Sequence, residues 1–195
     1  MFIKNLFDKI MSLIILLILS PVLIVIGVLI KLDSKGPVFF IQERVGLNEK
    51  LFNVYKFRTM VTNAYEISGY YTEENDPRIT KIGKLLRKTS LDELPQLINI
   101  LKGDMSIIGP RPTLEYQVKE YNDFQRQRLK MKPGVTGWAQ VNGRNSISWP
   151  NRIEYDVEYV NNYSFMFDIK ILLKTIRVVL KRDGIYGEEE NFKIR

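Results

Sequence analysis

Two adjacent carboxylates, Asp92 and Glu93, are the strongest candidates for chemistry in this sequence. The simplest interpretation of the stretch Ser90–Pro95 is a helix start in which Ser90 caps the backbone and Glu93 bonds back to it. Pro95 favours another start, because proline is best tolerated as the first helical residue. In both cases the carboxylates lie at a helix N-terminus, whose partial positive charge keeps them ionised. An ionised aspartate can attack phosphorus and can bind Mg²⁺.

The composition narrows the chemistry further. The chain of 195 residues contains no Cys and no His. Disulfides, thiolate nucleophiles, zinc sites made of Cys and His, and Ser–His or Cys–His pairs are therefore excluded. An acid, base or nucleophile in this protein has to be a carboxylate, a lysine, a tyrosine or a hydroxyl group. The hydrophobic content of 45% is enough for the core of one domain of ordinary size.

Four basic residues are candidates for binding phosphate. Lys56 and Arg58 end a predicted strand, Arg111 lies between two prolines, and Arg144 lies in a glycine-rich loop. A guanidinium on a rigid turn suits bidentate binding of phosphate. Taken one at a time, such residues are more often solvated at the surface. The net charge of +7 suits an anionic membrane surface, a nucleotide or a nucleic acid equally.

The glycine-rich stretch Pro133–Arg144 is a further candidate for ligand contact, because glycine allows a ligand to approach the backbone closely. Trp138 could stack on a base or lie at a membrane interface, and Gln140 and Asn142 could bond to polar edges of a ligand. A tightly packed loop with a buried Trp138 is the simpler interpretation. The stretch matches neither the Walker motif nor the dinucleotide-binding motif.

The elements that must position these residues follow from hydrophobic periodicity and turn residues. Two runs of strand-forming residues around a turn at Gly46–Glu49 predict a β-hairpin over Val38–Thr59. Leucines and isoleucines at helical spacing predict a helix over Leu91–Leu101 that ends at Gly103. The remaining expectations are a surface loop at 62–78, a helix beginning near Ile82, a rigid turn at Gly109–Pro112, a charged helix over Leu114–Met131 and a loop over Lys132–Asn145.

A last predicted helix has one apolar and one basic face. The apolar face comprises Ile169, Leu172, Leu173, Ile176, Val179 and Leu180, and the basic face comprises Lys170, Lys174, Arg177 and Lys181. This pattern suits a helix that lies in a membrane interface, and it suits a surface helix on an ordinary core equally.

An uncharged stretch of 21 residues, Ile10–Ile30, lies near the N-terminus. As a helix it would be roughly 31 Å long, close to the thickness of the hydrocarbon core of a bilayer. It is longer than the apolar region of a cleaved signal peptide. Ser20 and Pro21 would break or kink a helix at its middle, and lysines on both flanks give no charge asymmetry. A spanning helix and a re-entrant hairpin that enters and leaves one leaflet fit these facts equally.

Several motifs occur together in an order found in one known family. They are Lys56–Met60, Ser90–Leu97, Leu101–Ser106, Gly109–Pro112 and Lys132–Gly137. With the hydrophobic segment broken by Ser–Pro before them and Asp168 after them, they make nearly the whole chain resemble the bacterial sugar transferases. These are the monotopic phosphoglycosyl transferases that begin glycan assembly on undecaprenyl phosphate. The resemblance is closest to the minimal members, which lack the additional N-terminal domain and the multiple spans of larger relatives.

The resemblance implies an α-rich α+β fold in two parts. Residues 1–35 would form a re-entrant membrane hairpin with its helix break at Ser20 and Pro21, so that both ends lie on the cytoplasmic side of the bacterial inner membrane. Residues 36–195 would form a small cytoplasmic catalytic domain with a β-hairpin and interfacial amphipathic helices.

The resemblance also implies a reaction. A sugar 1-phosphate would pass from a UDP-sugar to undecaprenyl phosphate with release of UMP, through a covalent aspartyl phosphosugar and with Mg²⁺ as cofactor. Asp92 matches the nucleophile and is the expected metal contact, and Glu93 matches its partner, with an open choice between steering Mg²⁺ and steering a proton. The residues expected to bind phosphate or nucleotide are Lys56, Arg58, Arg111, Gln140, Asn142 and Arg144, and Asp168 is expected to support the site.

Two other functions compete with this one. A membrane-anchored protein that binds nucleotide sugars without turnover is the main alternative, and the intact pair Asp92 and Glu93 argues against it. Nothing in the sequence resembles a DNA-recognition helix or an aromatic RNA-binding sheet, so nucleic acid is not an expected partner. The similarity to minimal members favours an N-acetylated amino sugar as the transferred group, and the oligomeric state stays open.

Overall fold

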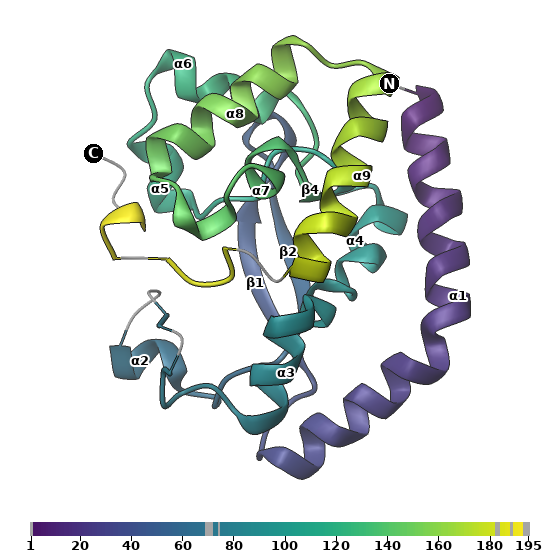
Figure 1. The fold of residues 1–195 in the computed structure, drawn as a ribbon, viewed down its shortest axis with the longest axis vertical. Helices are drawn as coiled ribbons and strands as arrows, with labels where there is room; N and C mark the ends of the chain where they lie inside the picture. Colours follow the sequence, from purple (N-terminus) through teal and green to yellow (C-terminus); the bar gives the residue numbers. More distant parts are fainter. Residues whose placement is uncertain (1, 69–71, 74, 182–183, 188, 193–195) are drawn as a thin grey trace.

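The computed structural model describes residues 2–68, 72–73, 75–181, 184–187 and 189–192. In this part of the chain, helices surround two small sheets (Figure 1), as expected for the α-rich α+β class. The α-helices are α1 (Phe2–Asp33), α2 (Ala64–Ser68), α3 (Lys81–Thr89), α4 (Gln96–Lys102), α5 (Glu115–Lys119), α6 (Asp123–Arg126), α7 (Trp138–Val141), α8 (Trp149–Asn161) and α9 (Phe165–Lys181). The strands are β1 (Phe39–Val45), β2 (Leu51–Phe57), β3 (Ser106–Ile108) and β4 (Gly134–Thr136), and the 3₁₀ turns are η1 (Leu47–Glu49), η2 (Leu91–Glu93), η3 (Gln127–Lys130), η4 (Arg144–Ser146) and η5 (Glu189–Phe192).

Strands β1 and β2 form the predicted antiparallel hairpin, in which Phe39 pairs with Phe57. The rings of this pair stack with their centroids 5.6 Å apart. Val54 and Phe57 are buried in the core. Since successive side chains of a strand point to opposite faces, Lys56 lies on the face opposite Phe57. The end of β2 therefore presents an amino group to the other side of the hairpin.

A second sheet joins β3 to β4 in parallel, with Ser106 opposite Gly134. The two backbones cross so closely that a Cβ atom on Gly109 would lie 2.3 Å from the carbonyl oxygen of Lys132. Glycine is thus required where the turn Gly109–Pro112 leaves β3. The expectation of a loop over Lys132–Asn145 was wrong for β4 and α7, because three-residue and four-residue elements are too short to show a period.

Helix α1 is continuous through Pro21 and changes direction partway along its length (Figure 1). The expected break is therefore a bend within one helix, and the hydroxyl of Ser20 donates to the carbonyl of Leu17 at 2.8 Å. Proline bends a helix because it lacks one hydrogen-bond donor and its ring meets the preceding turn. Within the described residues, α1 is long and apolar enough to cross a membrane, and most of its apolar side chains are exposed.

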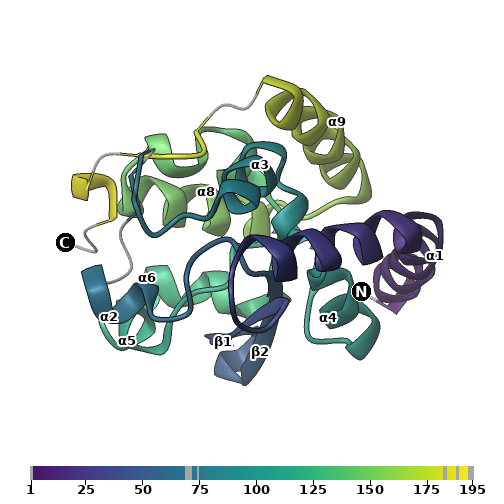
Figure 2. The ribbon, with the colours of Figure 1, turned by 90° about the horizontal axis from the view of Figure 1, so that it is seen from below.

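Both ends of α1 are attached to the rest of the domain. Near its start, Lys4 donates to the Asp168 carboxylate at 2.6 Å, and Asp8 accepts from Ser106 at 2.5 Å. At its end, the Asp33 carboxylate accepts from the backbone N–H of Ile82 at 2.9 Å. Helices α1 and α9 lie on the same side of the molecule (Figure 2). α9 has the predicted apolar face, and Leu172, Leu173, Ile176 and Leu180 are exposed on it.

Two expectations about the surface segments were wrong. The single charged helix over Leu114–Met131 is instead α5, α6 and η3, because Asn122 caps a new helix by accepting from the backbone N–H of Gln125 at 2.9 Å. The segment 62–78 contains α2 and is not wholly at the surface. Its last residue, Arg78, is buried and pairs with Asp76 at 2.6 Å.

Gly83 provides a test of the packing between α3 and the hairpin. An exposed glycine inside a helix costs about 0.5–1 kcal/mol relative to alanine, so replacement normally stabilises. Here a Cβ atom on Gly83 would lie 2.0 Å from the carbonyl oxygen of Thr59, which is backbone. We expect Gly83→Ala to lower the free energy of unfolding by about 1–3 kcal/mol. Thermal unfolding in detergent measures the change.

Gly27→Ala is the matched control, because Gly27 also lies within a helix and its Cβ would meet Val38 at an ordinary 3.5 Å. This variant should be neutral or more stable. Equal stability of the two variants would contradict the close packing of α3 against Thr59.

Candidate active site

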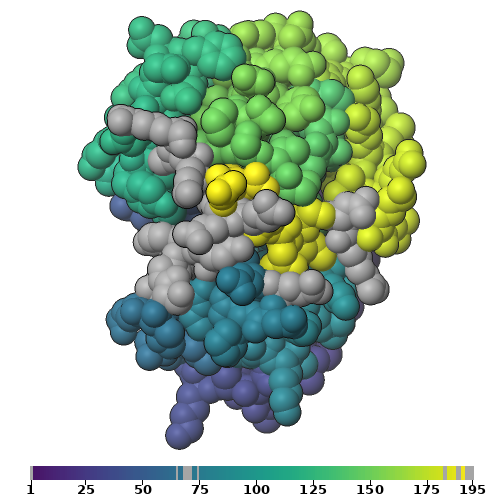
Figure 3. Space-filling model, turned by 60° about the vertical axis from the view of Figure 1, so that its left-hand side comes forward, coloured from purple at the N-terminus to yellow at the C-terminus, as the bar shows by residue number. Residues whose placement is uncertain are grey.

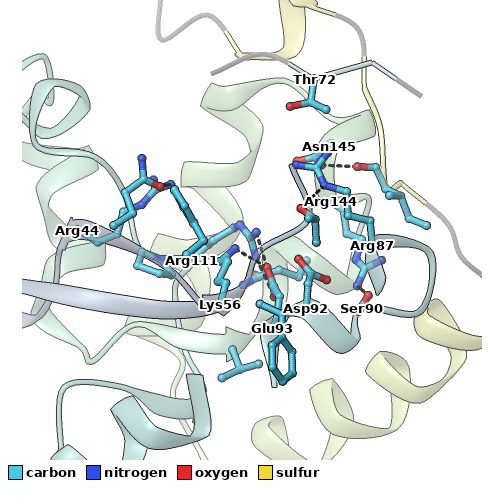
Figure 4. A pocket seen from close by; sticks show the side chains of 18 of the residues that line it. Arg44, Lys56, Thr72, Arg87, Ser90, Asp92, Glu93, Arg111, Arg144 and Asn145 are labelled. Carbon is cyan, nitrogen blue, oxygen red and sulfur yellow. Dashed lines mark hydrogen bonds and ion pairs between the residues drawn. The ribbon is translucent and has the colours of Figure 1, made fainter. Parts of the chain in front are cut away.

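A cavity of about 1170 Å³ lies between the β-hairpin, the segment joining α3 to α4, the turn after β3, and the helices α7 and α8. C-terminal residues also line it, and Figure 3 shows them in yellow between the green part of the molecule and the blue part. Asp92 and Glu93 lie on its wall with Lys56, Arg111 and Arg144 (Figure 4). The structure thus brings together five of the residues that the sequence selected.

The local backbone explains how Asp92 and Glu93 reach the cavity. Helix α3 ends at Thr89, and Ser90 adopts the left-handed conformation with φ 57°. Ser90 does not cap the next helix with its side chain, so the capping interpretation was wrong. Pro95 precedes the first residue of α4, close to the position that the alternative gave it. The two carboxylates therefore lie on the 3₁₀ turn η2, before α4 begins.

Glu93 is held by two cations. Its Oε1 accepts from Lys56 Nζ at 2.8 Å and from Arg111 Nη2 at 2.8 Å, and its Oε2 accepts from Arg111 Nη1 at 3.5 Å. Burial alone would raise the pKa of this carboxyl group, but the charges of Arg111 and Lys56 outweigh burial and lower the pKa well below its ordinary value. Glu93 is therefore a fixed anion that ties β2 to the turn after β3.

Asp92 has the opposite environment. Burial, and then repulsion from Glu93, raise the pKa of Asp92 to about 6, against the weaker opposing effects of Lys56, Arg87 and Arg111. In the described part of the chain, no salt bridge ends on the Asp92 carboxylate, whereas both oxygens of Glu93 are occupied. Asp92 is thus a carboxylate with cations around it and with its oxygens available to a ligand in the cavity.

Arg87 lines the cavity but was not predicted from the sequence as a site residue. It lies in the last turn of α3, where it reads as an ordinary basic residue of an amphipathic helix. Its Nε donates to the Thr59 hydroxyl at 3.1 Å, and its charge lowers the pKa of Asp92. Arg144 approaches the same side and donates to the Ser90 hydroxyl at 3.0 Å. Figure 4 shows Arg87 and Arg144 on one side of Asp92 and Lys56 and Arg111 on the other.

A buried ion pair holds the backbone of Arg111 in place. This pair was not predicted from the sequence. Arg128 and Asp156 form this pair and are 3% and 1% exposed. Arg128 also donates to the backbone carbonyl of Arg111 at 2.9 Å and to the Tyr121 hydroxyl at 2.6 Å. The two partners come from η3 and α8, so only the folded chain shows that they act on the turn at Arg111.

Some candidate residues lie elsewhere or are occupied. Arg58 lines the cavity, but its guanidinium is buried. It donates to the backbone carbonyls of Ser34 and Lys35 at 2.8 and 2.5 Å, so Arg58 holds the chain just after α1 in place. Asn142 is outside the cavity lining, where it donates to the Trp138 carbonyl and accepts from Lys174. Asp168 is also remote and joins α9 to Lys4 and to the Tyr159 hydroxyl.

The remaining two candidates are on α7. Trp138 is buried, its indole N–H donates to Glu158 at 2.8 Å, and Lys174 lies over its ring. Stacking of Trp138 on a base is therefore wrong, and the simpler interpretation of a packed tryptophan is confirmed. Gln140 lines the cavity as expected for a ligand contact, and neither atom of its buried amide has a partner in the described structure.

The contrast between the two carboxyl groups can be measured directly. We expect a pKa of about 6 for Asp92 in the native chain, followed by carbon-13 NMR of labelled Asp carboxyl groups and assigned with Asp92→Asn. Glu93→Gln removes the neighbouring negative charge and leaves Lys56 and Arg111 in place, so the pKa of Asp92 should fall. Asp76 is the internal control. Hydrogen bonds with Arg78 lower the pKa of Asp76, and this pKa should be the same in Glu93→Gln as in the native chain. A pKa of Asp92 that is unchanged in Glu93→Gln would contradict the coupling of the pair.

Comparisons with known proteins identify the family of this chain. The family described as "Bacterial sugar transferase" matches residues 1–182. The chain is 47% identical over 185 residues to an "Uncharacterized sugar transferase EpsL" of Bacillus subtilis, covering 95% of this chain and 91% of that protein. It is 44% identical over 200 residues to an "Undecaprenyl-phosphate galactose phosphotransferase" of Salmonella typhimurium, covering 95% of this chain and 42% of that protein.

A third relative is named for a different sugar. The "UDP-glucose:undecaprenyl-phosphate glucose-1-phosphate transferase" of Escherichia coli is 44% identical over 177 residues, which are 87% of this chain and 38% of that protein. The chain thus spans less than half the length of two of these three relatives. Because the family match covers nearly all of the chain, this protein belongs to the bacterial sugar transferase family.

Proposed function

We propose that this protein transfers a sugar 1-phosphate from a UDP-sugar to undecaprenyl phosphate and releases UMP. The observation that carries the proposal is the Asp92 carboxylate, which has no salt bridge among the described residues and lies between two groups of cations in a large cavity. The names of the two relatives at 44% identity support the class of donor and acceptor. The reaction is the first membrane step in the assembly of a glycoconjugate.

The proposed route has two displacements at one phosphorus atom. A carboxylate oxygen of Asp92 attacks the β-phosphorus of the UDP-sugar, the new O–P bond forms, and the P–O bond to the α-phosphate breaks with its electron pair leaving on UMP. A phosphate oxygen of undecaprenyl phosphate then attacks the same phosphorus, and the Asp92 carboxylate leaves. Neither step requires a cysteine, a histidine or a net proton transfer to Asp92.

The cations have complementary tasks in this route. The transferred phosphoryl group carries its charge on oxygens, so catalysis depends on positioned positive groups. Arg111 is rigid because Arg128 fixes its carbonyl and Glu93 fixes its guanidinium. Glu93 stays ionised and occupied by Lys56 and Arg111, so it acts in the proposed route as an anchor for these cations and not as a proton carrier.

The donor atoms present fit a magnesium ion shared with the substrate. Within the described residues, no group of three acidic side chains could hold a metal alone. Mg²⁺ in phosphate-transfer sites is usually bound by one or two carboxylates together with phosphate oxygens. Asp92 is the available carboxylate of this site and would hold the ion with the diphosphate of the donor. When bound, Mg²⁺ neutralises charge on the diphosphate and on the departing UMP.

The proposed acceptor is a membrane lipid, and the exposed apolar helices would hold the protein at the membrane that contains it. α1 and α9 lie on the same side of the molecule (Figure 2), and both expose apolar side chains. We propose that α1 enters and leaves one leaflet of the bacterial inner membrane by means of its bend, and that α9 lies in the interface. The domain with Asp92 would then meet the lipid phosphate from the cytoplasmic face.

Turnover and labelling test the reaction. The purified protein in detergent, given UDP-sugar, Mg²⁺ and undecaprenyl phosphate, should release UMP and form a lipid diphosphosugar. Asp92→Asn should lower the rate by at least about a thousandfold, because it removes the attacking oxyanion. With the acceptor withheld, phosphorus-32 in the β-position of the donor should remain on the native protein and not on Asp92→Asn.

Asp123→Asn is the matched control, since Asp123 is exposed on α6 and does not line the cavity. Its turnover should equal that of the native chain. Full turnover by Asp92→Asn would exclude the aspartyl intermediate, and UDP-sugar binding by the native chain without UMP release would indicate a binding protein.

Topology is tested by single cysteines at Asn5 and Ser34, which lie at the two ends of α1. The native chain contains no cysteine, so the labelling background is low. Both positions should react with a membrane-impermeant thiol reagent in inverted vesicles only, because a re-entrant helix returns to the side from which it enters. Labelling of the two positions from opposite sides would establish a spanning helix.

A further inference from the structure

The C-terminal segment, defined here as residues 184–187 and 189–192, forms part of the wall of the active-site cavity. Gly184, Ile185 and Tyr186 line the cavity together with Thr72 from the segment after α2. In Figure 3 the yellow atoms of this region lie between the two larger parts of the molecule. Side chains from the end of the chain therefore lie in the same cavity as Asp92.

Asn145 attaches this segment through most of its polar groups. Its backbone N–H donates to the Gly184 carbonyl at 3.2 Å, and its side-chain amide donates to the Ile185 carbonyl at 2.7 Å. Its own carbonyl accepts from the Asn191 amide at 3.4 Å. Arg152 binds the Asn145 side chain at 3.3 Å and the Asn191 carbonyl at 3.0 Å. The segment is thus fixed at several points to the loop before α8.

Two glycines allow the segment to lie this close. A Cβ atom on Gly184 would lie 2.4 Å from the Gly143 carbonyl oxygen, and one on Gly187 would lie 1.8 Å from the Asn145 carbonyl oxygen. Gly184 also has φ +64°, which favours glycine. The backbone of the segment is therefore shaped to pack on the loop Gly143–Asn145.

The same loop reaches the catalytic turn. Arg144 lies next to the anchor Asn145, has φ 52°, and donates to the hydroxyl of Ser90, two residues before Asp92. A group transferred at Asp92 is therefore close to the loop that carries the C-terminal segment. Arg144 and Asn145 lie on one side of Asp92 (Figure 4), and Asn145 holds the C-terminal segment on that side of the cavity.

The C-terminal segment lies beyond the residues that the family model matches. The family match ends at residue 182, two residues before Gly184. The relatives that share the matched region are named for different sugars, galactose and glucose. A wall that lies outside the family match can differ between members of the family while Asp92 and its cations stay in place.

We infer that the C-terminal segment, through Ile185 and Tyr186, contacts the sugar of the donor and determines which UDP-sugar is accepted. This inference rests on the proposed function. The chemistry is suitable, because a tyrosine offers a ring face to the C–H groups of a sugar and a hydroxyl to its oxygens, and isoleucine offers an apolar contact. One or two such contacts change selectivity by roughly ten to a few hundredfold.

Binding measurements without turnover test the inference. In the Asp92→Asn background, which consumes no donor, calorimetry would compare UDP with UDP-glucose, UDP-galactose and their N-acetylated counterparts. A chain that stops after Asp183 should bind its preferred UDP-sugar at least tenfold more weakly, while its affinity for UDP changes less than twofold. Tyr186→Ala in the full chain should show the same pattern with a three- to tenfold loss, so that the test does not depend on the shortened chain alone.

Phe124→Ala is the control, because Phe124 is an exposed aromatic residue on α6 that does not line the cavity. It should leave every affinity unchanged. An equal loss for UDP and for UDP-sugars would overturn the inference, since the segment would then hold the nucleotide, and so would an unchanged preference among the four sugars. Failure of the full chain to bind any UDP-sugar would contradict the proposed function itself and the inference with it.

Discussion

The shared contact of Glu93 with Lys56 and Arg111 is the constraint on which the architecture of this protein depends. A buried carboxylate is stable only if cations compensate its charge, and removal of one partner leaves an uncompensated charge behind. Lys56 comes from the β-hairpin, Arg111 from the turn after β3, and Glu93 from the 3₁₀ turn between α3 and α4. All three segments must therefore be in place at once. The β-hairpin positions Lys56, the close approach of Gly109 to Lys132 positions the turn after β3, and Arg128 fixes Arg111 on that turn.

The same arrangement gives two neighbouring carboxyl groups different properties. Glu93 is paired with Lys56 and Arg111 and stays ionised, while burial and the negative charge of Glu93 raise the pKa of Asp92. Two like charges in one site push their pKa values apart, which is how adjacent acidic residues acquire different roles. For the proposed transfer, this division leaves Asp92 as the group that can bind the incoming phosphorus. The cations around Asp92 compensate its negative charge only partly, because Lys56 and Arg111 are already paired with Glu93.

The sequence predicted the features that depend on neighbours along the chain. The β-hairpin, α3, the two faces of α9 and the pair Asp92 and Glu93 all show in local spacing, and the helix-rich fold class was correct. Features that depend on distant contacts were missed or wrong. Arg87 looks like any basic residue of a helix, Arg128 meets its partner in another element, and Arg58 serves the end of α1 only because the fold brings Ser34 and Lys35 to it. The cap at Asn122 was not predicted, because Asn122 lies within a charged pattern that favours one continuous helix.

The ties at the two ends of α1 have a mechanical consequence. Lys4 holds the start of the helix to Asp168, while Asp33 and the carbonyls bound by Arg58 hold its end to α3 and β2. The helix can therefore neither slide nor tilt without carrying the domain along. In the proposed membrane location, the depth of α1 fixes the height of Asp92 above the lipid phosphates. Bilayer thickness, which alters how deeply an apolar helix settles, would then act on the reaction rate through geometry alone, with no change in any residue of the site.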